Sequence, residues 1–302
     1  MSYLSQKKKQ ERINSFLNVA IFIVALFTVV VLAAPQRGFF SHFVDWQFQY
    51  YIAMLLLFCY AVAVRYFFQA AVLLLFICIN YVSLSSYSNI FFNVSGEGKE
   101  KFSIVYQNNT EQAGKLISEA DRQDADVIAV NPAGTLTDVI DDNYRLFHDD
   151  ADLSKSFILT NNPVIRSGTV RFTPGQTASY LIVSKYGREI MIINVDFSQM
   201  TPAEEALVFK NMNEFVLEQN IPVIIVGNFG ISSWKEVFSG FLRQSGMEVK
   251  NRVILSDGKS FFNPLVKPSI YLLGYKTLGV EQISFLNRGD DKSYPILFKL
   301  RL

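Results

Sequence analysis

Hydrophobic residues run without interruption through three stretches near the N-terminus. Residues 16–34 contain no charged side chain, and at about 1.5 Å of rise per residue a helix of this length crosses the apolar core of a bilayer. Two more apolar runs follow at 48–64 and 66–84 and are separated only by Arg65, which predicts a tight helical hairpin. The pattern therefore predicts three transmembrane helices (16–84) behind a basic cytoplasmic N-terminus at residues 1–15.

Each apolar run has an alternative interpretation. The first could be a cleaved signal peptide, because the N-terminus is basic and Ala33 and Ala34 are small. Its apolar stretch is longer than that of a signal peptide, and two more runs follow it, so a retained anchor is favoured. The second and third runs could be core helices of a soluble protein, but they have no polar face, which favours membrane spans.

The basic residues predict an orientation for these helices. Arg65 lies between the second and third runs, only Arg37 lies in the first loop, and four more basic residues precede the first run: Lys7, Lys8, Lys9 and Arg12. Cytoplasmic loops carry the excess of Lys and Arg, so the N-terminus and Arg65 are predicted to be cytoplasmic. Three crossings then place the chain after Leu84 on the other side, which in a bacterium means the periplasmic side of the inner membrane.

After a linker predicted at 85–100, the pattern changes to short apolar segments with turn residues between them. Segments rich in β-branched and aromatic residues, bounded by Gly, Pro and Asn, predict strands. There are nine of them, at 102–106, 126–130, 156–160, 168–172, 179–184, 190–197, 222–227, 269–273 and 295–300. Together they predict two sheets packed face to face, with helices outside.

Apolar residues at helical spacing predict three helices among these strands, at 111–123, 201–219 and 233–246. The second opens with Thr201, Pro202 and Glu204, which form the pattern of a capping box. The third repeats this pattern with Ser233 and Glu236 and is predicted to end at Gly246.

Composition and charge separate the two parts further. The chain is 50% hydrophobic with a mean hydropathy of +0.21, and its net charge of +1 combines a basic N-terminal part with an acidic distal part. Residues 95–302 contain 22 Lys and Arg against 25 Asp and Glu, a net charge of −3. The distal part therefore lacks the basic surface of a nucleic-acid-binding protein. Both cysteines, Cys59 and Cys78, lie in apolar runs, so the distal part has neither a disulfide nor a thiol site.

The order of the distal segments carries a family resemblance. "FSIVYQNN" is followed by a helix and "DADVIAV", and then come "IMIINVDF", a second helix, "IPVIIVGNFGISSW" and the terminal "GDDKSYPILFKL". Residues 101–302 resemble the endonuclease/exonuclease/phosphatase superfamily, in its bacterial branch with a membrane-spanning N-terminus. The resemblance implies an α/β fold of the DNase I type, a two-sheet β-sandwich flanked by helices. In active members it also implies phosphoester hydrolysis by a divalent cation held by carboxylates, with an Asp-His pair and amide side chains around the phosphate.

The residues that carry this chemistry in the family are replaced here. Gln107 stands where the first strand of the family ends in Asn, and Asn109 follows closely. Asn131 and Pro132 replace a Gln-Glu pair whose Glu is the principal metal ligand, and proline offers no ligand atom. Asp196 replaces a phosphate-binding His in "NVDF".

The later motifs depart in the same way. "GNFG" places Asn228 and Gly230 where the family has Asp and Asn, and "PSIYLL" replaces a strand that carries Ile-Asp-His. Lys292 and Ser293 stand at the Asp and His positions before the last strand. The chain has two histidines, His42 in the first predicted loop and His148 in a polar loop, so no second distal histidine completes the family's pair.

These substitutions predict that the site has no catalytic residue, no metal and no cofactor. Magnesium requires anionic oxygen ligands, whereas Gln107, Asn131 and Asn228 offer neutral amides and Lys292 adds positive charge. What remains is a vestigial pocket of Asn109, Asn131, Asp196, Asn228 and Lys292. Asp196 is a structural acceptor or a ligand contact, and Lys292 would favour an anion.

Two other acidic groups have alternatives. Asp290 and Asp291 would be a displaced metal pair, although a polar turn is favoured because Asp and Gly form turns. The acidic residues at 141–142 and 148–152 would hold a cation weakly, but they lack the spacing of a known calcium loop, which favours a solvated loop.

The sequence thus predicts an inactive phosphoesterase-like domain on a membrane anchor. It would act as a binding or scaffolding subunit of an envelope assembly, in contact with the lipid bilayer and other membrane or envelope proteins, with Asn80 and Ser83 available for interhelical hydrogen bonds. The first alternative is a magnesium-dependent hydrolase with relocated ligands at Asp196, Asp291 and His148. The second is a sensor of a small molecule, an anion or a lipid headgroup.

Overall fold

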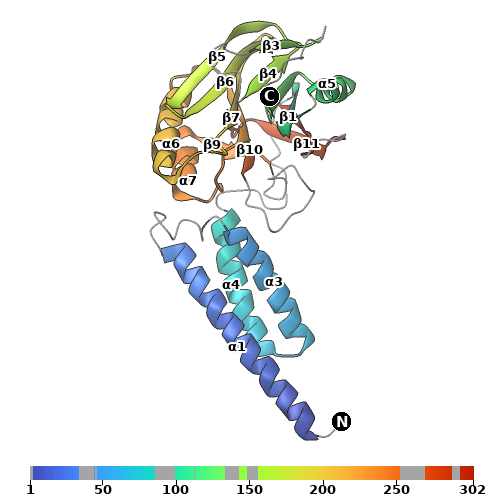
Figure 1. The fold of residues 1–302 in the computed structure, drawn as a ribbon, viewed down its shortest axis with the longest axis vertical. Helices are drawn as coiled ribbons and strands as arrows, with labels where there is room; N and C mark the ends of the chain where they lie inside the picture. The colour runs from blue at the N-terminus through green and yellow to red at the C-terminus, as the bar shows by residue number, and fades with distance from the viewer. Residues whose placement is uncertain are drawn as a thin grey trace. The chain divides into compact units, whose positions relative to one another are not determined.

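A computed structural model describes residues 3–33, 44, 46–85, 99–111, 113–132, 143–147, 156–251, 269–287 and 293–302. The chain divides into two compact units, Met1–Ser86 and Tyr87–Leu302 (Figure 1). Most of the predicted linker, residues 86–98, lies outside the described residues.

In its described residues, the first unit has three helices, α1 (Tyr3–Ala33), α3 (Gln47–Ala63) and α4 (Phe67–Ser85). Within the described residues, two segments are long and apolar enough to cross a membrane, Gln6–Leu32 of α1 and all of α4. The helix α3 is apolar but has 17 residues and is shorter than these two. The predicted set of three spans is therefore supported for two helices by length and composition. The predicted hairpin is present, and Arg65 makes its turn with a φ of 63°.

Polar side chains join these helices to one another. Asn80 of α4 is buried and donates from Nδ2 to Thr28 Oγ1 of α1 at 3.1 Å. Gln47 of α3 donates from Nε2 to Ser83 Oγ of α4 at 3.0 Å. Asn80 and Ser83, which the sequence offers for contacts with partner helices, thus form interhelical hydrogen bonds inside their own unit.

The described residues of the second unit form two mixed sheets of six strands each. The first sheet has the order β11-β12-β1-β2-β4-β3, with β1 (Lys101–Thr110), β2 (Val127–Pro132), β3 (Arg145–Phe147), β4 (Phe157–Thr160), β11 (Gly279–Phe285) and β12 (Ile296–Arg301). The second has the order β5-β6-β7-β8-β10-β9, with β5 (Val164–Thr173), β6 (Gln176–Lys185), β7 (Arg188–Asp196), β8 (Val223–Asn228), β9 (Met247–Val249) and β10 (Ile270–Tyr275).

Helices lie outside the sheets, as the sequence predicts. The helix α5 (Ala113–Arg122) connects β1 to β2, and α6 (Pro202–Leu217) connects β7 to β8; both of these strand pairs are parallel. The helix α7 (Glu236–Ser245) follows β8. In Figure 1, α6 and α7 lie together on one side of this unit and α5 lies on the other. The described apolar core accordingly has three parts: one lies between the two sheets, one beneath α6 and α7, and one beneath α5.

All nine predicted strands are present, within a few residues of their predicted bounds. Three further strands, β3, β9 and β11, were not predicted. The capping box of α6 is confirmed, since the Glu204 carboxylate accepts a hydrogen bond from the Thr201 N–H at 3.0 Å. The end of α7 at Gly246, in the left-handed conformation with a φ of 70°, is confirmed as well.

The predicted cap of α7 is wrong. The helix begins at Glu236, with Lys235 as its N-cap residue. Ser233 lies in the preceding turn, fully buried, and its N–H donates to the Tyr271 hydroxyl at 2.9 Å. The Lys235 side chain is also buried and pairs with Glu205 of α6 at 2.6 Å. Tertiary contacts with β10 and α6 therefore fix this turn, and they override the local capping pattern.

Candidate functional site

The two parallel strand pairs bring most of the predicted site residues to one end of the sandwich. Gln107 and Asn131 lie near the carboxyl ends of β1 and β2, where Asn108 pairs with Asn131. Asp196 and Asn228 end β7 and β8 and pair with each other. The family resemblance implies ligands of the metal and the phosphate at these strand ends.

Asn131 connects the two sheets. Its amide Nδ2 donates to the Tyr106 hydroxyl at 2.9 Å and to the Val195 carbonyl of β7 at 3.0 Å. Asn194 of β7 makes the reciprocal connection, because its Nδ2 donates to the carbonyls of Val130 in β2 and Phe157 in β4, both at 3.0 Å. Asn131 and Asn194 are 1% and 0% exposed, so these amides form hydrogen bonds that hold the sandwich together where solvent cannot compete.

Gln107 and Ser293 connect β1 to the segment before the last strand. Gln107 donates from Nε2 to the Ser293 carbonyl at 3.1 Å, and the Ser293 hydroxyl donates to the Asn108 carbonyl. Gln107 and Ser293 are both 1% exposed. Each of these side chains therefore bonds to a backbone carbonyl of the other segment. In the resemblance, position 107 corresponds to a phosphate-binding Asn and position 293 to a catalytic His.

The "GNFG" turn after β8 has a backbone that requires glycine. Gly227 has a φ of 149° and Gly230 a φ of 69°. A Cβ atom on Gly227 would lie 2.1 Å from the Val195 carbonyl oxygen, and one on Gly230 would lie 2.3 Å from the Phe197 carbonyl oxygen. Asn228 stabilises the turn, because its Oδ1 accepts a hydrogen bond from the Gly230 N–H at 3.1 Å. The Asn that the family places at position 230 has no room here unless the backbone moves.

Among the predicted site residues that the structure describes, only Asp196 carries a carboxylate. It is partly buried, and its Oδ1 accepts a hydrogen bond from the Ser198 N–H at 3.1 Å. Burial raises the pKa of the Tyr106 phenol well above its usual value, and the nearby negative charge of Asp196 raises it further, against a smaller opposing effect of the Asn131 hydrogen bond. Tyr106 is therefore neutral at physiological pH and serves as a hydrogen-bond acceptor for Asn131.

Several predicted residues cannot be placed. Lys292, His148, Asp290 and Asp291 and the acidic residues at 141–142 and 148–152 lie outside the described residues, as does the side chain of Asn109. Pro132 ends β2 and pairs with Thr110 of β1 across an irregularity in the register. Within the described ranges, no group of three or more His, Cys, Asp or Glu side chains comes together in the way a metal site needs.

Two contributors to this end of the sandwich, Tyr106 and Asn194, were not predicted. Both are visible as polar groups inside or at the end of an apolar strand, in "IVYQ" and "IINVD". A buried polar group requires a hydrogen-bond partner, so a polar residue within an apolar strand is the sequence feature that indicates such a contact.

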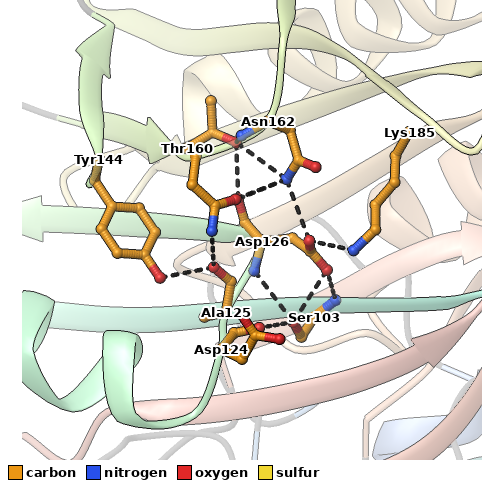
Figure 2. Close-up of polar contacts among 9 residues, drawn as sticks. Ser103, Asp124, Ala125, Asp126, Tyr144, Thr160, Asn162 and Lys185 are labelled. Atoms are coloured by element: carbon orange, nitrogen blue, oxygen red, sulfur yellow. Dashed lines mark hydrogen bonds and ion pairs between the residues drawn. The ribbon is translucent and has the colours of Figure 1, made fainter.

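A second polar cluster lies at the opposite end of β1 and β2 (Figure 2). The Asp126 carboxylate, 10% exposed, forms an ion pair with Lys185 of β6. It also accepts hydrogen bonds from the Ser103 N–H at 2.9 Å, the Ser103 hydroxyl at 3.1 Å and Asn162 Nδ2 at 3.2 Å. This cluster contains a charged pair between the two sheets, whereas the candidate site bridges them with amides.

Known proteins match the chain only in structure. No protein-family profile and no curated protein matches its sequence. A humanised TDP2 of D. rerio superposes with a TM-score of 0.51 at 14% identity, over 67% of this chain and 99% of that one. An endonuclease/exonuclease/phosphatase family protein from Bacteroides thetaiotaomicron gives a TM-score of 0.50 at 11% identity, over 68% and 96% of the two chains.

The endonuclease domain of TRAS1, a telomere-specific non-LTR retrotransposon, gives a TM-score of 0.50 at 12% identity, over 67% of this chain and 99% of that one. The distal unit has the endonuclease/exonuclease/phosphatase fold. The fold predicted from the resemblance is thereby confirmed. At these identities the likeness extends to the fold alone, because one fold supports many different sites.

Proposed function

We propose that the protein is a membrane-anchored, catalytically inactive phosphoesterase-like protein whose distal unit binds other proteins of the cell envelope. The observation that carries this proposal is how the replaced side chains are used. Gln107, Asn131 and Asn228 form hydrogen bonds within the sandwich or within their own turn, and Gly230 has no room for a side chain. A site under selection for hydrolysis would present such groups to a ligand.

The donor set does not fit a magnesium ion. Mg²⁺ keeps its ligands only when anionic oxygens offset its dehydration, and of the described strand-end residues only Asp196 is anionic. A single partly buried carboxylate with three neutral amides supplies too little charge to hold the ion tightly. We infer no hydrolytic step at these residues.

The first unit supports a membrane anchor. Seven large apolar side chains of α1 are exposed within the unit, namely Phe16, Val19, Phe22, Ile23, Leu26, Val29 and Leu32. Water would make this exposure unfavourable, whereas lipid would cover it. In the proposed arrangement α1, α3 and α4 cross a bacterial inner membrane, the N-terminus is cytoplasmic, and the distal unit is periplasmic.

Catalytic inactivity can be tested on the full-length protein in detergent micelles. Unfolding temperatures are measured by differential scanning fluorimetry with and without Mg²⁺ or Mn²⁺, and bis-p-nitrophenyl phosphate reports turnover. A ligand that binds the folded state raises its unfolding temperature, so we expect neither a metal-dependent shift nor turnover above the rate without enzyme. Metal-dependent turnover that is lost in Asp196→Asn would establish the hydrolase with relocated ligands and overturn the proposal.

The anchor and the envelope role need a separate experiment. Alkaline phosphatase fused to the C-terminus in a bacterial host should be active, because it folds only in the periplasm, and a green fluorescent protein fusion at the same position should stay dark. In vivo crosslinking from the distal unit should then trap other envelope proteins. An inactive alkaline phosphatase fusion would show that the distal unit is cytoplasmic. That result would contradict both the proposed topology and the proposed envelope partners.

A further inference from the structure

The strand β5 forms an open edge of the second sheet. It lies at the end of the strand order, next to β6, and runs for 10 residues (Figure 1). Three consecutive residues near its start, Ile165, Arg166 and Ser167, are exposed, as is Arg171. An edge strand of this length presents a row of backbone N–H and C=O groups that another strand can bind.

Only the first two thirds of this edge are open. At its far end, Asn211 of α6 donates from Nδ2 to the Phe172 carbonyl at 2.6 Å, and Thr173 is buried. Irregularities in the pairing with β6 fall before Arg166 and after Arg171. Between them lies a regular six-residue stretch with one outer side uncovered by the described elements.

The charge of this edge differs from that of the rest of the unit. The segment 156–188 contains no Asp or Glu and four basic residues, although the distal part as a whole has a net charge of −3. Lys185 is paired with Asp126, and Arg188 lies 3.6 Å from Glu100. The Arg166 guanidinium lies over the Tyr180 ring, 5.9 Å from its centroid. In the described part of the chain, neither Arg166 nor Arg171 has a carboxylate within ion-pair distance, so both charges are available to a partner.

We propose that β5 is a docking edge to which a partner protein adds an acidic, extended segment as a further strand. Strand addition of this kind gains affinity from backbone hydrogen bonds and specificity from side chains. Here Arg166 and Arg171 select for acidic residues, and Ile165, 51% exposed, offers an apolar contact. The inference rests on the proposed binding function and names the chemistry of the partner.

Charge disfavours a second copy of this chain as the occupant of the edge. Two copies paired through the same strand would bring Arg166 and Arg171 of each copy close to those of the other, and like charges on paired strands are unfavourable. Basic residues on an edge also protect against aggregation. Protection alone leaves unexplained why the whole segment 156–188 lacks acidic residues and why Ile165 is exposed beside Arg166.

Arg166 and Arg171 are five residues apart in the regular stretch and therefore face opposite sides of the sheet. The test uses the full-length protein in micelles and a fluorescent decapeptide of Glu-Glu-Val-Val repeats, which places Glu on both faces of an added strand. One control peptide carries Lys in place of Glu, and a second has the same sequence with N-methyl groups on alternate amides, which blocks strand pairing. Anisotropy measures affinity, and hydrogen exchange followed by mass spectrometry locates the contact. We expect binding of the Glu peptide alone, with slower exchange confined to residues 164–173.

Charge-reversal variants locate the electrostatic contribution. Exposed charges at an interface act mainly through complementarity, and reversing two of them should weaken binding on the order of tenfold. We expect this loss in Arg166→Glu/Arg171→Glu. Arg243→Glu/Lys276→Glu changes the net charge equally at exposed positions outside β5 and α6 and should change the affinity less than about twofold.

Each other outcome overturns the inference. Absence of binding would assign the basic edge to protection against aggregation, and equal binding of the N-methylated peptide would show attraction without strand pairing. Concentration-dependent dimers with slow exchange at 164–173 would assign the edge to a second copy. The phosphodiester assay on the same samples separates the two proposals. Turnover together with peptide binding would contradict the proposed catalytic inactivity and would still support the docking edge.

Discussion

The two ends of β2 hold the sheets together in different ways. At its start, Asp126 forms a charged pair with Lys185 and accepts three further hydrogen bonds (Figure 2). At its other end, Asn131 bridges the sheets with an uncharged amide. The resemblance implies a carboxylate cluster only at the second end, next to Asn131.

This difference shows that the fold itself does not exclude buried carboxylates. Asp126 stabilises the sandwich at one end, and amides stand at the other end, where the resemblance implies metal ligands. A buried charge requires a compensating partner, and Lys185 provides one. Without a metal, carboxylates at the Asn131 end would face one another unbalanced, whereas amides carry no charge, and the amide nitrogens of Gln107 and Asn131 donate to backbone carbonyls there.

The largest expected effect comes from breaking the charged end. Asp126→Ala removes four acceptor contacts and leaves Lys185, 19% exposed, without its partner. Loss of one member of such a pair destabilises the folded state by about 3 kcal/mol. The free energy of unfolding can be measured by denaturation in a Trp46→Phe background, in which Trp234, buried in the distal unit, is the reporter.

A double variant and an exposed pair provide the controls for that measurement. Asp126→Ala/Lys185→Met should recover part of the loss, because no uncompensated charge remains and the side chain still packs near the Phe102 ring. Glu214→Ala breaks the exposed pair with Lys210 at 3.7 Å and should change stability by less than about 0.5 kcal/mol. Equal losses in Asp126→Ala and Glu214→Ala would contradict the structural role of the charged end.

The second prediction concerns restoring the family motif. Asn228→Asp/Gly230→Asn rebuilds "GDFN", but a Cβ at position 230 would meet the Phe197 carbonyl oxygen at 2.3 Å. Backbone incompatibility of this kind destabilises by about 2 kcal/mol, so the variant should unfold more easily and still show no Mg²⁺-dependent rise in unfolding temperature. The matched control Asn228→Asp alone retains Gly230 and should lose less stability. A Mg²⁺-stabilised double variant would show that the turn still accommodates the active arrangement.

The third prediction tests the amide bridge. Asn131→Ala leaves the Val195 carbonyl in the interior without its donor and should destabilise the folded state by about 1.5 kcal/mol. Asn194→Ala is the matched change on the facing strand and should have a similar effect. Because the two amides connect neighbouring positions of the same two sheets, the double variant should lose less than the sum of the single losses. Full additivity would indicate that the two bridges act independently.

Local patterns predicted the strands and helices but not the contacts that define the site. Alternation and β-branched residues were sufficient for long strands such as β6 and β7. The strand β11 was missed because Glu281 and Gln282 interrupt its apolar pattern beside an irregular pairing with β12. The strands β3 and β9 are three residues long, too short for any periodic signal.

The candidate site depends on contacts between residues far apart in the sequence. The resemblance identified Gln107 and Asn131, yet their partners come from distant parts of the chain: Gln107 bonds to Ser293, 186 positions away, and Asn131 to Val195, 64 positions away. The sequence does not predict the ion pair of the charged end, because Asp126 and Lys185 are separated by 59 positions and neither stands in a recognised motif. Only the packing of two sheets brings these pairs together.

The smallest expected effect concerns Tyr106, which lies against the amide end. Burial, assisted by the charge of Asp196, raises the pKa of its phenol. A group whose pKa is raised in the folded state contributes stability that is complete below its unfolded pKa, about 10, and is lost as the pH rises above it. Tyr106→Phe should therefore flatten the fall of stability above pH 10, while at pH 7 it removes one hydrogen bond and changes stability by less than about 1 kcal/mol. Tyr275→Phe is the comparison, because Tyr275 is half-buried and burial raises the pKa of its phenol. An equal flattening in Tyr275→Phe would show that the loss of stability at alkaline pH is not specific to the amide end.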